Sequence, residues 1–320
     1  MQVQHRSMVR HKLSMPGLVA GALAAVGYTC ASTLLRELSK SVDAAWVATI
    51  KAATTAIIFV PILIYYQRRG RKLLPPIKAV LGLLAAAIIV QLAGNLAYQW
   101  ALGQIGLALV VPLTMGVMVV CSAVGGRMIL KEQVSFGLAI SLLVLIVSVV
   151  LLSFGGQRAG EAIGNIEKPG VWILAGIAAG LAGASFSILG ISIRVAMKSP
   201  IPAALPMAIV GVVGTILLGA ITVANNGWDV VWQSSSRDWA LMWGAGLLNS
   251  VSFFALTYSL KRVPVIYVNA INVSQVALGA IVGITLFLEP ISSWLATGLV
   301  VMLIGFIMVG ATTNQQTRSI

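Results

Sequence analysis

Long uncharged apolar runs dominate this chain and restrict it to folds that suit a lipid bilayer. About 20 helical residues cross a hydrocarbon core of about 30 Å. Because backbone groups in lipid must be paired internally, and because the runs are continuously apolar rather than alternating, we expect helices and not a barrel. Ten such spans are predicted, at 16–35, 44–66, 79–102, 105–126, 134–154, 171–193, 201–224, 239–260, 263–288 and 291–311.

Composition leads to the same class. The chain is 59% hydrophobic and only 9% charged, which leaves too few polar side chains to cover a soluble globule of 320 residues. The predicted fold class is therefore an all-α integral membrane protein.

A stretch that occurs twice divides the chain into halves. AYQWALGQIG at 97–106 resembles FALTYSLKRVP at 254–264, and Leu102 and Leu260 are about 158 residues apart. Such self-similarity is typical of a duplicated transporter. Five spans per half is an odd number, so the halves enter the membrane from opposite sides and form two inverted repeats of five helices. The predicted organisation is a cytoplasmic tail at 1–15, a first five-helix repeat at 16–154, an outer connecting loop at 155–170, a second five-helix repeat at 171–311 and a cytoplasmic tail at 312–320.

The net charge of +13 comes from basic residues in short loops, not from the folded polar face of a nucleic-acid reader, so no nucleic-acid partner is expected. If the N-terminus is cytoplasmic, 15 of the 21 Lys and Arg fall on the cytoplasmic side. By the positive-inside rule, both termini are predicted to face the cytoplasm.

Polar side chains near the middle of several spans are candidates for a substrate cavity. In the third span, Gln91, Asn95 and Tyr98 share one helix face. Amides and tyrosines suit a small zwitterionic or neutral polar metabolite better than a dianion. The alternative is that each residue only binds helices together. The predicted substrate-binding set, able to meet in one layer, is Tyr28, Gln91, Asn95, Tyr98, Thr114, Ser185, Asn249, Asn272 and Gln275.

Lys51 is the one formal charge well inside a span. An intramembrane charge is a functional candidate by default, although a lysine at this depth can also extend outward to the interface. We expect Lys51 and Glu289 to form an ion pair that gates the outer mouth. The alternative for Glu289 is a hydrated glutamate at a loop end.

The sequence lacks the residue patterns that are typical of catalysis and of energy-driven pumping. Both histidines, His5 and His11, lie in the first tail, and Cys30 and Cys121 sit singly in separate spans, so no metal and no cofactor are expected. No carboxylate lies deep in a span, and no phosphate-binding loop is present. An enzyme is therefore not expected, and uncoupled movement or exchange is favoured over ion-driven transport.

These features together resemble the EamA-type family of the drug/metabolite transporter superfamily, over roughly residues 16–311. The resemblance rests on two halves of five spans, Glu132 and Glu289 after the fourth and ninth spans, and Lys51 following D-A-A-W at 43–46. It implies a transporter in the cell inner (plasma) membrane that moves a small metabolite, an amino acid or related compound, outward through a central cavity by alternating access. Lys51 stands where the family commonly has a basic residue, but the second half has no basic counterpart near Ala208.

The partners implied are a small-molecule substrate and the lipid bilayer, with a homodimer left open. The alternative function is a channel or a non-transporting membrane scaffold protein. Duplication favours the transporter.

Overall fold

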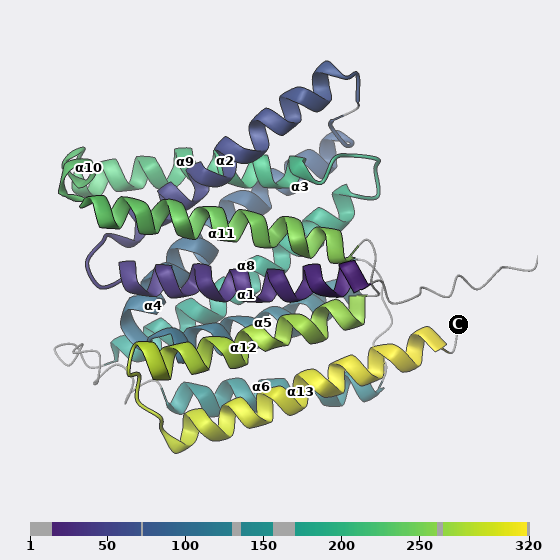
Figure 1. Ribbon diagram of the computed structural model, residues 1–320. Coiled ribbons are helices and arrows are strands. Elements are labelled where there is room, and N and C mark those ends of the chain that lie inside the picture. Colours follow the sequence, from purple (N-terminus) through teal and green to yellow (C-terminus); the bar gives the residue numbers. More distant parts are fainter. Residues whose placement is uncertain (1–14, 72, 130–135, 156–169, 261–264, 319–320) are drawn as a thin grey trace, which may run out of the picture.

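The computed structural model describes residues 15–71, 73–129, 136–155, 170–260 and 265–318, and every regular element among them is helical (Figure 1). The first half contains α1 (Met15–Leu38), α2 (Ala44–Arg68), α3 (Ile77–Ile89), the π-helix η1 (Val90–Leu96), α4 (Ala97–Ile105), α5 (Leu107–Ile129) and α6 (Phe136–Phe154). The second half contains α8 (Val171–Ala196), α9 (Ala204–Asn226), α10 (Asp229–Gln233), α11 (Ser236–Leu260), α12 (Val265–Leu286) and α13 (Ser293–Arg318).

Within the described residues, nine helical segments are long and apolar enough to cross a membrane. One of them, Ile77–Ile105, is built from α3, η1 and α4 without a break. The predicted span at 263–288 falls on α12, whose described apolar part is Ser274–Leu286. The all-helical membrane protein is thus confirmed, whereas ten spans in two inverted repeats stay a prediction.

Local sequence signals fix several helix ends. Asp43 precedes α2 and accepts the backbone N–H of Trp46 at 2.9 Å, which satisfies one of the free amides of the first turn. Ser292 does the same for Leu295 in α13. Between α4 and α5, Gly106 has φ +79, a conformation that favours glycine and reverses the chain within one residue.

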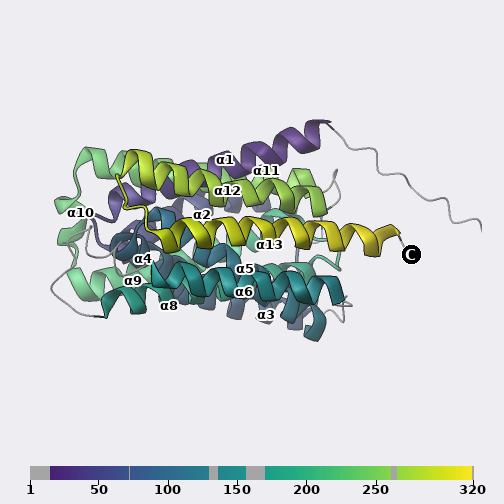
Figure 2. The ribbon, with the colours of Figure 1, turned by 90° about the horizontal axis from the view of Figure 1, so that it is seen from below.

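The helices pack mainly as pairs from opposite halves of the chain. The most extensive pairs are α1 with α11, α2 with α9, α5 with α8, and α6 with α13. The last pair lies side by side in both views (Figures 1 and 2). Because most contacts cross from one half to the other, a relative movement of the halves changes the bundle interior.

Small residues allow the closest approach between α5 and α8. A Cβ on Gly183 would meet the backbone of Thr114 and Met118, so only glycine fits there. Gly176, one part of a GxxxG pair in the same helix, has no neighbouring atom within 4 Å of the place that a Cβ would occupy. The tight contact therefore lies two turns further along α8 than that motif alone indicates.

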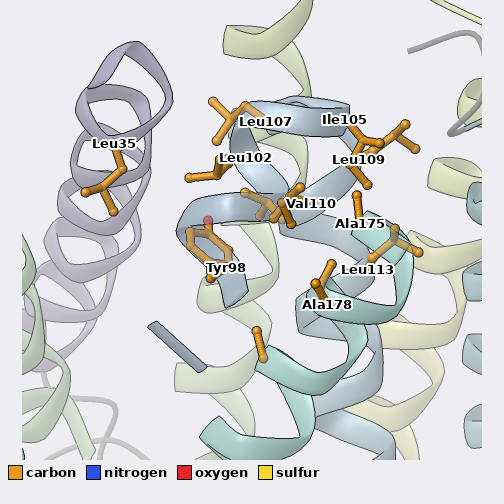
Figure 3. Close-up of a cluster of buried hydrophobic side chains, with 14 of the residues drawn as sticks. Leu35, Tyr98, Leu102, Ile105, Leu107, Leu109, Val110, Leu113, Ala175 and Ala178 are labelled. Atoms are coloured by element: carbon orange, nitrogen blue, oxygen red, sulfur yellow. The ribbon is translucent and has the colours of Figure 1, made fainter. Parts of the chain in front are cut away.

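The largest buried apolar cluster surrounds the α4–α5 turn (Figure 3). Leu102, Ile105, Leu107 and Leu109 come from the two sides of this turn, and α1 contributes Leu35. This core holds one end of the bundle together. We name it the α4–α5 end; α1 begins and α13 finishes at the opposite end, the α2–α3 end (Figure 1).

Candidate functional site

Lys51 lies in the second turn of α2 and points into the bundle. The residue is 8% exposed, and its Nζ donates to Oδ1 of Asn95 at 2.7 Å. The ammonium is thus bound to an amide on a neighbouring helix and does not extend along α2 to the interface. The structure therefore differs from the alternative left open by the sequence, in which the lysine extends outward to the interface.

Asn95 and Gln91 belong to the π-helical segment η1. A π-turn adds one residue to the helical ladder, and such turns are frequent at functional sites. Asn95 Nδ2 donates to Gln91 Oε1 at 2.8 Å, and Gln91 Nε2 donates to the backbone oxygen of Val210 in α9 at 2.7 Å. A polar relay therefore runs from Lys51 through two amides to α9, and it fixes which atom of each amide faces its neighbour.

Tyr98 lies one turn beyond Asn95, in α4. Its hydroxyl is 3.1 Å from Ser32 Oγ in α1, and its ring meets Phe186 of α8 edge-on, with centroids 6.4 Å apart. Tyr28 lies one turn before Ser32 on the same face of α1. These residues extend the polar interior along α1 and α4 toward the α4–α5 end.

Asn249 faces the interior from α11. The exposed stripe of that helix is formed by Trp243, Leu247 and Val251, and Asn249 lies away from it. The neighbouring Ser250 hydroxyl is 3.3 Å from that of Thr55, one turn past Lys51 on α2. Asn249 and Tyr28 are both half-buried, and neither side chain makes a hydrogen bond to another described residue.

Four of the predicted site residues have other contacts. Thr114 donates to the backbone oxygen of Ala179 at 3.1 Å and is packed between α5 and α8. Ser185 is buried against η1 and donates within its own helix. Gln275 donates to Asn272 Oδ1 at 3.0 Å inside α12. Direct contacts therefore join Gln91 and Asn95 with Lys51, and they do not assemble all nine residues into one layer.

Glu289 does not pair with Lys51 as the sequence suggested. Its Oε1 accepts from Arg36 Nε at 2.9 Å, in a pair whose side chains are 4% and 3% exposed. Arg36 is available because α1 continues to Leu38, three residues past the predicted span. Glu132, the other glutamate of the resemblance, lies outside the described residues.

The carboxylate of Glu289 also caps α5. It accepts the backbone N–H groups of Leu107 at 2.8 Å and Ala108 at 2.7 Å, the first two amides of that helix. A negative charge is favoured there by the helix dipole. The preceding residue, Leu288, has φ 54, an uncommon conformation for a side chain of its size, and this turn directs Glu289 back into the bundle.

Two glycines make room for this carboxylate. A Cβ on Gly106 would collide with Glu289, and a Cβ on Gly283 would lie 2.8 Å from the amide nitrogen of Ala108. Phe287 adds a ring beneath Arg36 and Lys40, with the Lys40 Nζ 4.9 Å from its centroid. The buried ion pair thus ties α1, α5 and the α12–α13 segment together at the α4–α5 end.

Sequence reasoning missed Arg36, because it follows the first apolar run directly and looks like a loop charge. The repeat offered a signal: Arg36 and Arg194 are 158 residues apart, the same spacing as Leu102 and Leu260. The ion pair itself joins positions 253 residues apart, which no local pattern indicates.

A pocket of about 770 Å³ opens at the α2–α3 end. Ile62 and Tyr66 of α2 line it together with Phe254 and Tyr258 of α11 and the α8–α9 turn. Phe254 stacks on the buried Phe59, with centroids 5.0 Å apart and planes at 10°. Along the same face of α2, this stack lies between the pocket and the polar residues Thr55 and Lys51.

Comparisons with known proteins agree with this architecture. Residues 15–154 match the EamA-like transporter family. A solved structure titled only "Crystal structure of protein" is similar in fold, with a TM-score of 0.59 and 16% sequence identity over 91% of this chain and 94% of that one. Among curated proteins, no match was found. Residues 15–154 of this multi-pass membrane protein thus match the EamA-like transporter family, which belongs to the drug/metabolite transporter superfamily.

Proposed function

We propose that the chain transports a small polar metabolite, an amino acid or a related compound, outward across the cell inner membrane by alternating access through a central cavity. The observation that carries this proposal is the partly buried relay of Lys51, Asn95 and Gln91, which joins helices of both halves in a chain whose residues 15–154 match a transporter family. Charged and amide groups in mid-membrane are expensive to keep, and in membrane proteins they mark substrate pathways.

The proposed domains are two inverted five-helix repeats at 16–154 and 171–311, joined by an outer loop at 155–170. Reciprocal packing supports the repeat. Helix α1 of the first half packs on α11 of the second half. In the reciprocal arrangement, α8 of the second half packs on α3, η1 and α4 of the first half, which together correspond to α11. The remaining pairs, α2 with α9 and α6 with α13, each join equivalent helices.

The distribution of charge supports a cytoplasmic α2–α3 end. Among the described residues, the acidic side chains gather at the α4–α5 end: Glu37, Asp43, Asp229, Asp238 and Glu289. Most basic residues among them lie at the opposite end, namely Arg68, Arg69, Arg71, Lys78, Arg127, Arg194 and Lys198, whereas Arg36, Lys40 and Arg237 lie at the α4–α5 end. By the positive-inside rule the latter end, where both tails attach, faces the cytoplasm.

In this proposal the Arg36–Glu289 pair is the outer gate. It takes the role that the sequence assigned to Lys51 and Glu289. The pair is buried, bridges both halves and is fixed by a helix cap, so opening the outer mouth requires its separation. The pocket at the α2–α3 end then serves as the cytoplasmic entrance, and the stack of Phe59 on Phe254 separates it from the relay.

Energy coupling is proposed to be absent, so that the protein exchanges or equilibrates its substrate. Glu289 is the one buried carboxylate among the described residues, and Arg36 already binds it. An ion-driven carrier needs a midplane group that gains and loses a cation.

Counterflow in proteoliposomes tests the function. Vesicles loaded with an excess of unlabelled substrate should transiently accumulate labelled substrate if the protein is a carrier. A channel gives flux without counterflow, and a non-transporting scaffold protein gives neither. Rates that collapse when only a pH gradient is removed would contradict the uncoupled mechanism.

A further inference from the structure

Three charged side chains are buried in the described part of the protein: Arg36, Lys51 and Glu289. Arg36 and Glu289 neutralise each other across 2.9 Å. Lys51 has no carboxylate within ion-pair distance among the described residues. Among the described residues, one positive charge in the bundle interior is therefore left without a counter-charge.

The groups around Lys51 leave hydrogen-bond donors available. An ammonium has three N–H donors, and Asn95 Oδ1 accepts one of them. The Asn95 amide nitrogen has two N–H donors, of which Gln91 Oε1 accepts one. Because Lys51 Nζ lies 2.7 Å from Asn95 Oδ1, the remaining donors belong to two neighbouring groups, one on α2 and one on η1.

Two further polar side chains come from helices that contact α4 and α2, through Ser32 with Tyr98 and Ser250 with Thr55. The side chains of Tyr28 in α1 and Asn249 in α11 are half-buried, lie on interior faces and make no hydrogen bond to another described residue. A hydroxyl and an amide of this kind can bind the rest of a small polar molecule, such as the amino group of an amino acid.

We propose that Lys51 and Asn95 bind the single carboxylate of the transported molecule. The inference rests on the proposed transport function and names its substrate class: compounds with one carboxylate, zwitterionic amino acids included. A carboxylate supplies the missing counter-charge and two acceptor oxygens for donors on two helices.

A purely structural lysine explains these observations less well. An ammonium in a membrane interior is costly, and an apolar residue of similar volume packs there without that cost. Binding of a carboxylate compensates this cost, so Lys51 selects substrates that carry a carboxylate.

Paired ligands test this site directly on the purified full chain. The probes are the standard amino acids and the α-amide of each, compared by thermal shift at several concentrations. We expect at least one acid to raise the melting temperature, and its amide to bind at least about tenfold more weakly. Absence of stabilisation by any acid, or equal stabilisation by acid and amide, would overturn the proposal.

Substitutions test whether the preference for acid over amide depends on Lys51. In Lys51→Met the preference for acid over amide should disappear, whereas Lys78→Met, the same change at an exposed lysine of α3, should keep it. If Lys51→Met fails to fold, Asn95→Asp gives an independent test, because a built-in carboxylate beside Lys51 should abolish acid binding. Retained acid binding in Asn95→Asp would overturn the site.

The same proteins separate this proposal from the transport function. Counterflow of an uncharged or cationic metabolite, without acid binding, would overturn the carboxylate site and leave the transporter standing. Acid binding that depends on Lys51, without counterflow, would support the carboxylate site and contradict the proposed transport function.

Discussion

Arg36 Nε lies 2.9 Å from Oε1 of Glu289, and the same carboxylate accepts the first two backbone amides of α5. One side chain therefore neutralises a buried guanidinium and caps a helix at the same time. Because Arg36 is in the first half and Glu289 in the second, the α4–α5 end is closed only while the halves stay together.

Removing one partner of this pair should open and weaken the α4–α5 end. Arg36→Met leaves a buried carboxylate without its cation and should cost about 3 kcal/mol of stability. A cysteine reporter at Ser32, in a background without Cys30 and Cys121, should then react with an impermeant maleimide from outside. As a control, Arg237→Met breaks a solvent-exposed pair with Glu37 and should cost less than about 1 kcal/mol, without exposing the reporter.

Exchanging the two charges should not restore the gate. Arg36→Glu with Glu289→Arg recreates an ion pair but places a cation at the N-terminus of α5, where the helix dipole disfavours it. Full recovery of stability and reporter protection in this double variant would show that the cap contributes nothing.

Gly106 should not tolerate a methyl group. In Gly106→Ala the side chain would occupy the position of the Glu289 carboxylate, and φ +79 adds backbone strain, so we expect a loss of about 2 kcal/mol or more. Gly82→Ala, in α3, has nothing within 4 Å of the new methyl group and should be neutral or slightly stabilising. Equal melting temperatures for the two variants would contradict the close packing at the α4–α5 turn.

The overall fold could be predicted from the sequence because bilayer thickness and the hydrogen-bond needs of the backbone leave few choices for long apolar runs. The stripe Gln91, Asn95 and Tyr98 was likewise visible, since helical periodicity places these residues on one face. What periodicity could not indicate was the π-turn that carries Gln91 and Asn95, because the extra residue has no distinct sequence signal.

The partners of the charged residues were the least predictable part of the candidate site. Lys51 and Glu289 were both singled out, but their partners depend on tertiary contacts: Asn95 for one and Arg36 for the other. Thr114 and Ser185 are polar and near mid-span, yet helix packing uses them. Residue type and depth alone do not distinguish a cavity residue from an interhelical hydrogen bond.

Replacing Asn95 and Asn272 separately by leucine should have unequal effects on transport. Asn95→Leu removes the acceptor of Lys51 and the donor to Gln91, so transport should be abolished. Asn272 accepts from Gln275 of its own helix, so we expect a partial loss at most from its replacement. Both variants should still be expressed, and the melting temperature of Asn95→Leu should fall because Lys51 Nζ and Gln91 Oε1 lose their partner. Normal transport by Asn95→Leu would place the substrate elsewhere.

Orientation can be measured with single cysteines at two exposed positions. Trp232→Cys lies at the α4–α5 end and should react with an impermeant reagent in intact cells. Lys198→Cys lies at the opposite end and should react only after the cells are opened. The reverse pattern would invert the proposed topology and make the gate of Arg36 and Glu289 cytoplasmic.

Counterflow of a carboxylate substrate tests the central claim most directly. Proteoliposomes containing the wild-type chain are loaded with the amino acid that stabilises it most and diluted into a trace of the labelled compound. We predict a transient accumulation that saturates with concentration, persists in Lys78→Met and is lost in Lys51→Met. Flux that rises linearly without accumulation, or counterflow that is unchanged in Lys51→Met, would contradict this claim.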